Sequence, residues 1–248
     1  MIDFRFKFDN SAEWGIFAPK ASDFGDNDSA ADSTATEESA FCAENNIVLP
    51  VQTHTDTVGV LTEPGQTFPD TDALVTSLRG VGVGVRTADC VPVVIYAPDI
   101  KAVAAVHAGW KGTLARIASK TVRMMVMDMG ADPELMKAAI GACVCGECYE
   151  VDESLAEMFE KKGLHDCVLR GEFTDPLGRQ EFDPRRPHID LAAANRKALL
   201  TSGLLRRNIQ MPELCSRHWH DEPDDTRLPS WRRCPGERQR MVTWIKLH

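Results

Sequence analysis

Through the middle of the chain, short hydrophobic runs are separated by Gly, Pro and Asp, a pattern typical of buried strands joined by turns. The runs are rich in β-branched residues, which favour extended backbone because their side chains pack well on a pleated surface. We predict strands at Ile47–Val51, Ala73–Thr76, Val81–Arg86, Val91–Tyr96 and Ala102–Val106, and a last one at Met241–Leu247.

Three other segments carry apolar residues at helical spacing. They are Gly112–Met129, Asp152–Lys162 and Asp190–Ser202, and the last two begin at aspartates suited to cap a helix. Strands and helices are mixed without a linker or an internal repeat. The pattern therefore predicts an α+β (mixed α/β) fold, a single domain over residues 1–248 with β-sheets covered by helices.

Composition narrows the class of protein. The 248 residues are 43% hydrophobic and 26% charged, which is typical of a globular chain. The formal charge of −9 argues against general nucleic-acid binding. The longest apolar runs are strand-sized and the N-terminus lacks a signal-peptide core, so we expect no membrane partner and a cytoplasmic location. Residues 21–45 are acidic and predict a surface loop.

Eight cysteines without a secretory signal are expected to be thiols, metal ligands or nucleophiles rather than disulfides. Cys143, Cys145 and Cys148 form a group that invites a second metal site. No C-x-x-C pair follows downstream, so we predict buried thiols near a turn instead.

Three segments each place a metal-ligating side chain at the edge of a predicted strand. They carry His54, Cys90 and His107, separated by 36 and 17 residues. Two imidazoles and one thiolate would leave the fourth position of a tetrahedral zinc ion open to water or substrate, as in catalytic sites. The spacing alone leaves hydrogen-bonded structural histidines as the alternative.

The residues around these three positions resemble those of a known family. Gln52–His54, Ala88–Val93 and His107–Gly112 match, in order and spacing, the laccase-domain or YfiH family. The resemblance covers most of the chain and continues through Ile140–Cys143, Cys148–Val151, Asp190–Arg196, Trp231–Arg233 and Arg240–Met241.

This resemblance implies an αββα layered sandwich and a zinc ion held by His54, Cys90 and His107. It also implies chemistry on purine nucleosides: phosphorolysis of adenosine, inosine or methylthioadenosine, and deamination of adenosine. Purine nucleosides and phosphate would then be the partners, with a homodimer as one assembly. Cys90 and His107 would be catalytic as well as metal-binding.

Further roles follow from charge and position. Phosphate needs fixed cations, for which Lys111 and the pair Arg232–Arg233 are the candidates, with Arg233 preferred. Each of them could equally be a solvated surface cation. Asp89 precedes Cys90 and is a candidate acid–base residue. On an alternating strand it would point away from Cys90, which favours a structural hydrogen bond equally.

Three rival functions use the same residues. Two histidines and a cysteine are also the ligands of a blue-copper centre, so a copper-dependent polyphenol oxidase is one alternative. The five remaining histidines are too few for the further copper cluster of a laccase. A metal-free cysteine hydrolase acting on cell-wall peptide fragments would use Cys90 as nucleophile and His107 as base. A zinc-stabilised binding module without enzymatic activity is the third.

Overall fold

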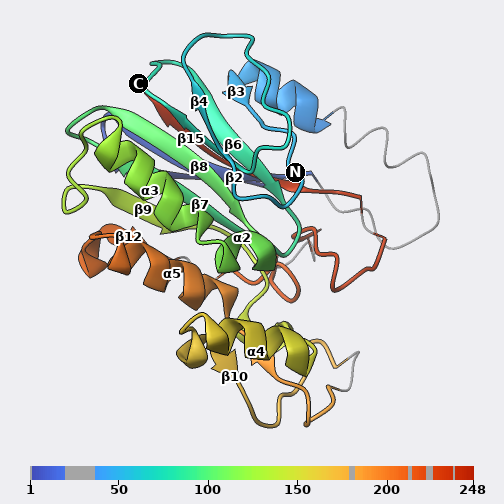
Figure 1. Cartoon of the computed structure of the whole chain (residues 1–248). Helices are drawn as coiled ribbons and strands as arrows, with labels where there is room; N and C mark the ends of the chain where they lie inside the picture. Colours follow the sequence, from blue (N-terminus) through green and yellow to red (C-terminus); the bar gives the residue numbers. More distant parts are fainter. Residues whose placement is uncertain (1, 20–36, 179–181, 212–213, 222–225, 237) are drawn as a thin grey trace.

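Two mixed β-sheets stack face to face and helices cover both outer faces (Figure 1). The computed structural model describes residues 2–19, 37–178, 182–211, 214–221, 226–236 and 238–248. The five-stranded sheet has the order β1 (Ile2–Asp9), β2 (Ala12–Ala18), β15 (Met241–Leu247), β6 (Gly82–Thr87), β3 (Ile47–Val48). The six-stranded sheet has the order β12 (Ile209–Gln210), β9 (Lys137–Ile140), β7 (Val91–Ala97), β8 (Ala102–Ala108), β5 (Ala73–Thr76), β4 (Val58–Leu61).

The remaining elements are short strand pairs and helices. The strand pairs are β10 (Val168–Leu169) with β11 (His188–Ile189), and β13 (His220–Asp221) with β14 (Thr226–Arg227). The α-helices are residues 37–44, α2 (Trp110–Leu114), α3 (Ile117–Met127), α4 (Glu153–Lys161) and α5 (Leu191–Thr201). Single 3-10 turns lie at Gly146–Cys148, His165–Cys167 and Arg206–Asn208.

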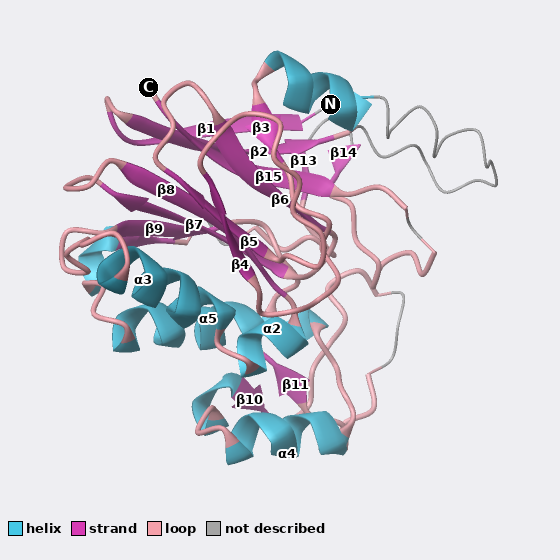
Figure 2. Cartoon of the chain, turned by 45° about the horizontal axis from the view of Figure 1, so that its top comes forward, coloured by secondary structure: helices cyan, strands magenta, loops and turns pink. Residues whose placement is uncertain are grey.

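The central strands are buried on both faces because each face meets a different layer. On β7, Val93 and Ile95 pack toward α3 and α5, whereas Val94 and Tyr96 pack between the sheets. Side chains alternate along a strand, so a strand buried on both faces is a continuous apolar run. Figure 2 shows α3 and α5 along one outer face of the six-stranded sheet.

The helix of residues 37–44 covers the opposite outer face. Its Phe41 ring stacks on Phe17 of β2 at 4.1 Å between centroids, next to Trp244 of β15. The layers therefore run helix, sheet, sheet, helix. The expected mixed α/β sandwich is confirmed.

The predicted strands are present with ends shifted by a few residues, and the structure adds strands that we did not predict. β1 and β2 form an antiparallel hairpin at the edge of the five-stranded sheet. In β1 the half-buried Phe4 and Phe6 alternate with the exposed Arg5 and Lys7. This alternation is the strand signal present in the N-terminal sequence.

The predicted helices need two corrections. The helix expected over Gly112–Met129 is two helices, because Arg116 adopts a left-handed backbone conformation with φ 60° between α2 and α3. Asp190 caps α5 by accepting a hydrogen bond from the Ala193 N–H at 2.8 Å. The Asp152 side chain does not cap α4; its carboxylate pairs with Arg186 instead.

Most of the acidic segment expected as a surface loop over residues 21–45 lies outside the described residues, and 37–44 within it are helical. Among the residues that the structure describes, no helix combines the length and apolar character needed to cross a bilayer.

Candidate active site

His54, Cys90 and His107 come together at one end of the sandwich. Their ligand atoms all lie within 4.8 Å of one another, with Cys90 Sγ 4.0 Å from His54 Nε2. The strand pairing explains this, because β7 and β8 are antiparallel and Pro92 pairs with His107. Cys90, just before β7, is thereby placed beside the end of β8, and the loop before β4 brings His54. The predicted convergence of the three side chains is confirmed.

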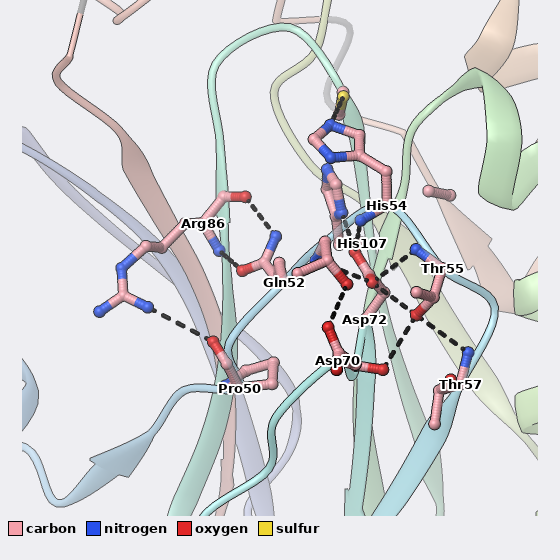
Figure 3. A network of polar contacts seen from close by, with 12 residues as sticks. Pro50, Gln52, His54, Thr55, Thr57, Asp70, Asp72, Arg86 and His107 are labelled. Carbon is pink, nitrogen blue, oxygen red and sulfur yellow. Dashed lines mark hydrogen bonds and ion pairs between the residues drawn. The ribbon is translucent and has the colours of Figure 1, made fainter.

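A fully buried carboxylate that the sequence analysis missed organises both histidines. Asp72 Oδ1 contacts His107 Nδ1 at 2.6 Å and accepts the His54 N–H at 3.1 Å. Asp72 Oδ2 accepts the backbone N–H groups of Thr53 and Thr55 and the Thr55 hydroxyl. Figure 3 shows these contacts converging on Asp72. Because Nδ1 of His107 is engaged, its Nε2 is the nitrogen left for a ligand.

The loop around His54 adopts a conformation that this carboxylate stabilises. His54 has φ 63°, in the left-handed region that residues with a Cβ rarely occupy. Three successive N–H groups, from Thr53 to Thr55, donate to Asp72. Their hydrogen bonds offset the backbone strain, of the order of 1–3 kcal/mol for such a residue. The strained backbone is what turns the His54 ring toward Cys90.

Electrostatics in the cluster favour a thiolate. Burial raises the pKa of the Cys90 thiol, but hydrogen bonds with His107 and His54 outweigh burial and bring the pKa down to about 7. Burial lowers the pKa of His107, but the contacts with Asp72 and Cys90 outweigh it and raise the pKa to about 9. Burial opposes ionisation of Asp72 too, yet its hydrogen bonds with His107 and Thr55 hold the pKa well below its usual range. A thiolate is the form of cysteine that binds metal or attacks as a nucleophile.

Gly109 leaves room for this close approach. A Cβ at this position would lie 3.0 Å from Cys90 Sγ and 3.2 Å from the His54 ring. Any larger residue would push against two of the three side chains. Close packing against Cys90 and His54 therefore explains the glycine at position 109.

The three side chains line a cavity of about 740 Å³, within the ~300–1,000 Å³ of small-molecule sites. Trp110, Tyr149 and Trp231 contribute rings to its lining, and the Trp231 side chain is 50% exposed. The cations in the lining are Arg86, Arg232 and Arg240. The Arg232 guanidinium lies 4.4 Å from the Tyr149 ring centroid and donates to the Glu150 carbonyl at 2.7 Å.

Asp89 is buried, and its carboxylate accepts hydrogen bonds from residues that form the wall of this cavity. Its Oδ1 accepts hydrogen bonds from the hydroxyls of Ser216 and Ser230 at 2.7 and 2.6 Å, and its Oδ2 accepts one from the backbone N–H of Arg232 at 2.7 Å. These contacts match the structural hydrogen-bond alternative. Asp89 fixes the segment that carries Trp231 and Arg232 against the strand end that carries Cys90.

Lys111 and Arg233, the two cations preferred for phosphate, do not line the cavity. Lys111 is exposed, with its ammonium 5.5 Å from the Trp110 ring centroid. The Arg233 guanidinium donates to the carbonyls of Ser216, Arg217 and Leu228. These contacts give Arg233 a structural place in the loop, while its neighbour Arg232 faces the cavity.

A second group of potential metal ligands lies apart from this cavity. Cys145 and Cys148 meet Cys215 and His218, again with all four ligand atoms within 4.8 Å. No C-x-x-C pair follows downstream in the sequence, but Cys215-Ser-Arg-His218 is a C-x-x-H pair, and the prediction of buried thiols left it out. Cys143 is buried and outside the group.

Comparison with known proteins places these geometries in context. The chain is 37% identical over 187 residues to adenosine deaminase RL5 from an unknown prokaryotic organism, covering 71% of this chain and 67% of the relative. It is 31% identical over 212 residues to a purine nucleoside phosphorylase of Bacteroides thetaiotaomicron, covering 82% and 73%. With a purine nucleoside phosphorylase of Deinococcus radiodurans it shares 43% identity over 137 residues, about half of each chain at 55% and 49%.

Solved structures share the fold. The Bacillus licheniformis protein YfiH superposes with a TM-score of 0.76 over 96% of this chain and 93% of its own, at 22% identity. A family model described as multi-copper polyphenol oxidoreductase laccase matches residues 21–248. The match spans both ligand clusters and nearly all strands, so the chain belongs to this laccase-domain family, in which the YfiH fold is found.

Proposed function

We propose that this chain is a zinc-dependent purine nucleoside enzyme that phosphorolyses adenosine, inosine and methylthioadenosine and deaminates adenosine. The observation that carries the proposal is the three-ligand cluster in a cavity that also offers aromatic rings and arginines. The relatives named purine nucleoside phosphorylase and adenosine deaminase support the same choice of substrates.

The donor set fits zinc with one position open. His54, Cys90 and His107 supply two imidazoles and a thiolate, and Asp72 orients His107 through Nδ1. Zinc bound there would supply a water of near-neutral pKa, the nucleophile that deamination of a purine needs. The protein's own contribution is to hold the three ligands and to leave the cavity side of the cluster open to substrate.

The aromatic rings and arginines of the cavity lining suit the two groups that phosphorolysis brings together, the purine base and phosphate. Tyr149 and Trp231 offer faces on which a purine can stack. Arg232 and Arg240 can bind phosphate on the ribose side, because a guanidinium grips phosphate with two parallel hydrogen bonds. Arg232 is already held by Tyr149 and Glu150, which lowers the entropy lost when it binds an anion. We therefore assign the phosphate role to Arg232 rather than to Arg233 or Lys111.

Copper oxidase chemistry finds less support in the described residues. They contain two groups of three or more metal ligands, and neither is a further cluster of histidines near His54 and His107. His188 and His218 lie near Gly146 and Cys148 instead. The described residues therefore offer no group of histidines beside this cavity for the further copper cluster of a laccase.

Turnover of a nucleoside panel tests the proposal. Adenosine, inosine and methylthioadenosine are incubated separately with and without phosphate. Free base and the sugar 1-phosphate (ribose 1-phosphate, or 5-methylthioribose 1-phosphate from methylthioadenosine) are measured, and inosine is measured as the deamination product of adenosine. Release of base that requires phosphate, lost in Cys90→Ser together with metal at this site, is the expected result. Peptide hydrolysis that survives chelation would point to the cysteine hydrolase, and phenol oxidation that needs copper to the oxidase; either without nucleoside turnover would overturn the proposal.

A further inference from the structure

The second ligand group joins two loops that are far apart in sequence. Cys145 and Cys148 lie in the loop after β9, and Cys215 and His218 lie in the segment after β12. The paired spacings, C-x-x-C and C-x-x-H, place two ligands on each loop. Paired ligands of this kind are the usual arrangement of a closed zinc site built from two turns.

The distances fit a tetrahedral ion. Cys148 Sγ lies 3.4 Å from His218 Nδ1, and no two of the four ligand atoms are more than 4.8 Å apart. In a zinc site with bonds of about 2.3 Å to sulfur and 2.0–2.1 Å to nitrogen, tetrahedral angles put neighbouring ligand atoms roughly 3.5–3.8 Å apart. The four atoms need move little to reach that geometry.

Two of the sulfur atoms in the group have hydrogen-bond donors beside them. The Cys145 N–H donates to Cys215 Sγ at 3.4 Å, and Arg217 Nη1 lies 3.7 Å from Cys148 Sγ. Arg217 is itself fixed by a buried ion pair with Asp175, with Nη2 2.9 Å from Oδ2. A sulfur that ligates a metal keeps lone pairs for such donors, so both contacts are compatible with metal-bound cysteines.

We propose that Cys145, Cys148, Cys215 and His218 bind a structural zinc ion, distinct from the metal at His54, Cys90 and His107. Four protein ligands leave no open position, which is the mark of a structural site. None of the four lines the cavity described above, so the site does not act on substrate.

The ion would fasten the segment that forms one wall of the active-site cavity. From Cys215 to the start of β15 at Met241, the described residues contain only the two-residue strands β13 and β14. Backbone hydrogen bonds tie Cys143 to Leu214 and Ser216, and Ser216 in turn donates to Asp89 beside Cys90. A zinc ion at Cys215 would therefore hold the loop from which Trp231 and Arg232 reach the cavity.

Metal content of single variants tests the site. Each full-length protein is purified without added metal, and bound zinc is measured by plasma mass spectrometry. Two zinc equivalents per chain are expected in the wild type. Cys148→Ser and Cys215→Ser should each lose the equivalent at the second site, and Cys90→Ser should lose the equivalent at the cavity. Cys234→Ser is the control, because Cys234 is a half-buried thiol in the same loop as Cys215 but lies outside the ligand group. Its zinc content should equal that of the wild type.

A second measurement on the wild-type protein covers the case in which a variant fails to fold. The native chain is treated with iodoacetamide before and after a zinc chelator, and the labelled peptides are identified by mass spectrometry. We expect Cys145 and Cys148 to react only after chelation. Equal labelling without chelator, a Cys145–Cys148 disulfide in the native protein, or unchanged zinc in folded Cys148→Ser would each overturn the proposal. Metal content and labelling are both measured without substrate, so this proposal can fail while wild-type nucleoside turnover succeeds, and the reverse.

Discussion

Asp72→Asn is the most informative single substitution at the cavity, because it changes one atom of a side chain that every neighbour uses as an acceptor. Three backbone N–H groups, the Thr55 hydroxyl and His107 Nδ1 all meet the two carboxylate oxygens. An amide has one oxygen and one NH₂ group. The oxygen is best kept where Oδ2 lies, since three donors meet there, and the NH₂ then faces the His54 N–H and His107 Nδ1.

Two effects follow, and each has a magnitude. The His54 N–H loses a charged acceptor, which removes about 1.5–3 kcal/mol of stability from a loop that already contains a left-handed residue. His107 can satisfy the new NH₂ only by accepting at Nδ1, and its proton then moves to Nε2. A protonated Nε2 cannot ligate metal. Changing the partner of a ligating histidine typically weakens metal binding about 10–100-fold, or roughly 1.4–2.7 kcal/mol.

Zinc affinity at this site is measured by competition with a chromophoric chelator, and stability by urea unfolding. The matched control is Asp70→Asn. Asp70 lies two residues away, but its carboxylate accepts only the exposed Thr53 hydroxyl among the hydrogen bonds described. We expect near-wild-type affinity in that control. If Asp72→Asn bound zinc within a factor of two of the wild type, the assignment of His107 Nε2 as a ligand through Asp72 would be refuted.

Three further outcomes are expected. Cys90→Ser should lose zinc at the cavity and all nucleoside turnover with an unchanged circular dichroism spectrum, because serine offers no thiolate at neutral pH; retained zinc there would remove Cys90 from the ligand set. Arg232→Ala should raise the phosphate KM about 10–100-fold, the equivalent of one charged contact, whereas Arg233→Ala should lower the melting temperature and leave the phosphate KM unchanged; the reverse pattern would return the phosphate role to Arg233. Asp89→Asn should keep zinc but lower kcat and melting temperature together, since one oxygen of Asp89 accepts two hydroxyls and the other the Arg232 N–H; loss of zinc would contradict this separation.

The fold could be predicted from the sequence where burial on both faces makes strands continuous apolar runs, as in β7 and β8. The hairpin β1–β2 was missed although its N-terminal alternation was visible, because an edge strand with one half-exposed face carries a weaker signal. The break at Arg116 had no such signal. Arginine is not a residue that marks a left-handed turn, and the position is set by the packing of α2 and α3.

At the site, the side chains with unusual chemistry were easier to predict than those that position them. A cysteine and two histidines at strand edges stand out by residue type, whereas Asp72 is one of several acids before a strand. Its role depends on five donors brought together by β5, β8 and the His54 loop. Arg232 and Arg233 are adjacent, and only the path of the loop decides which guanidinium reaches the cavity.

Two buried aspartates hold different parts of the cavity in place. Asp72 fixes the loop of His54 and the ring of His107, and Asp89 fixes the segment that carries Arg232. Asp72 lies just before β5 and Asp89 just before β7, and both strands belong to the six-stranded sheet. The metal ligands and the cavity wall are therefore held against the same sheet. Sites held by such buried hydrogen bonds keep their geometry within the small tolerance that catalysis needs. The wall after β12, with few strands of its own, is where this support is thinnest, and Cys215 and His218 of the second ligand group lie there.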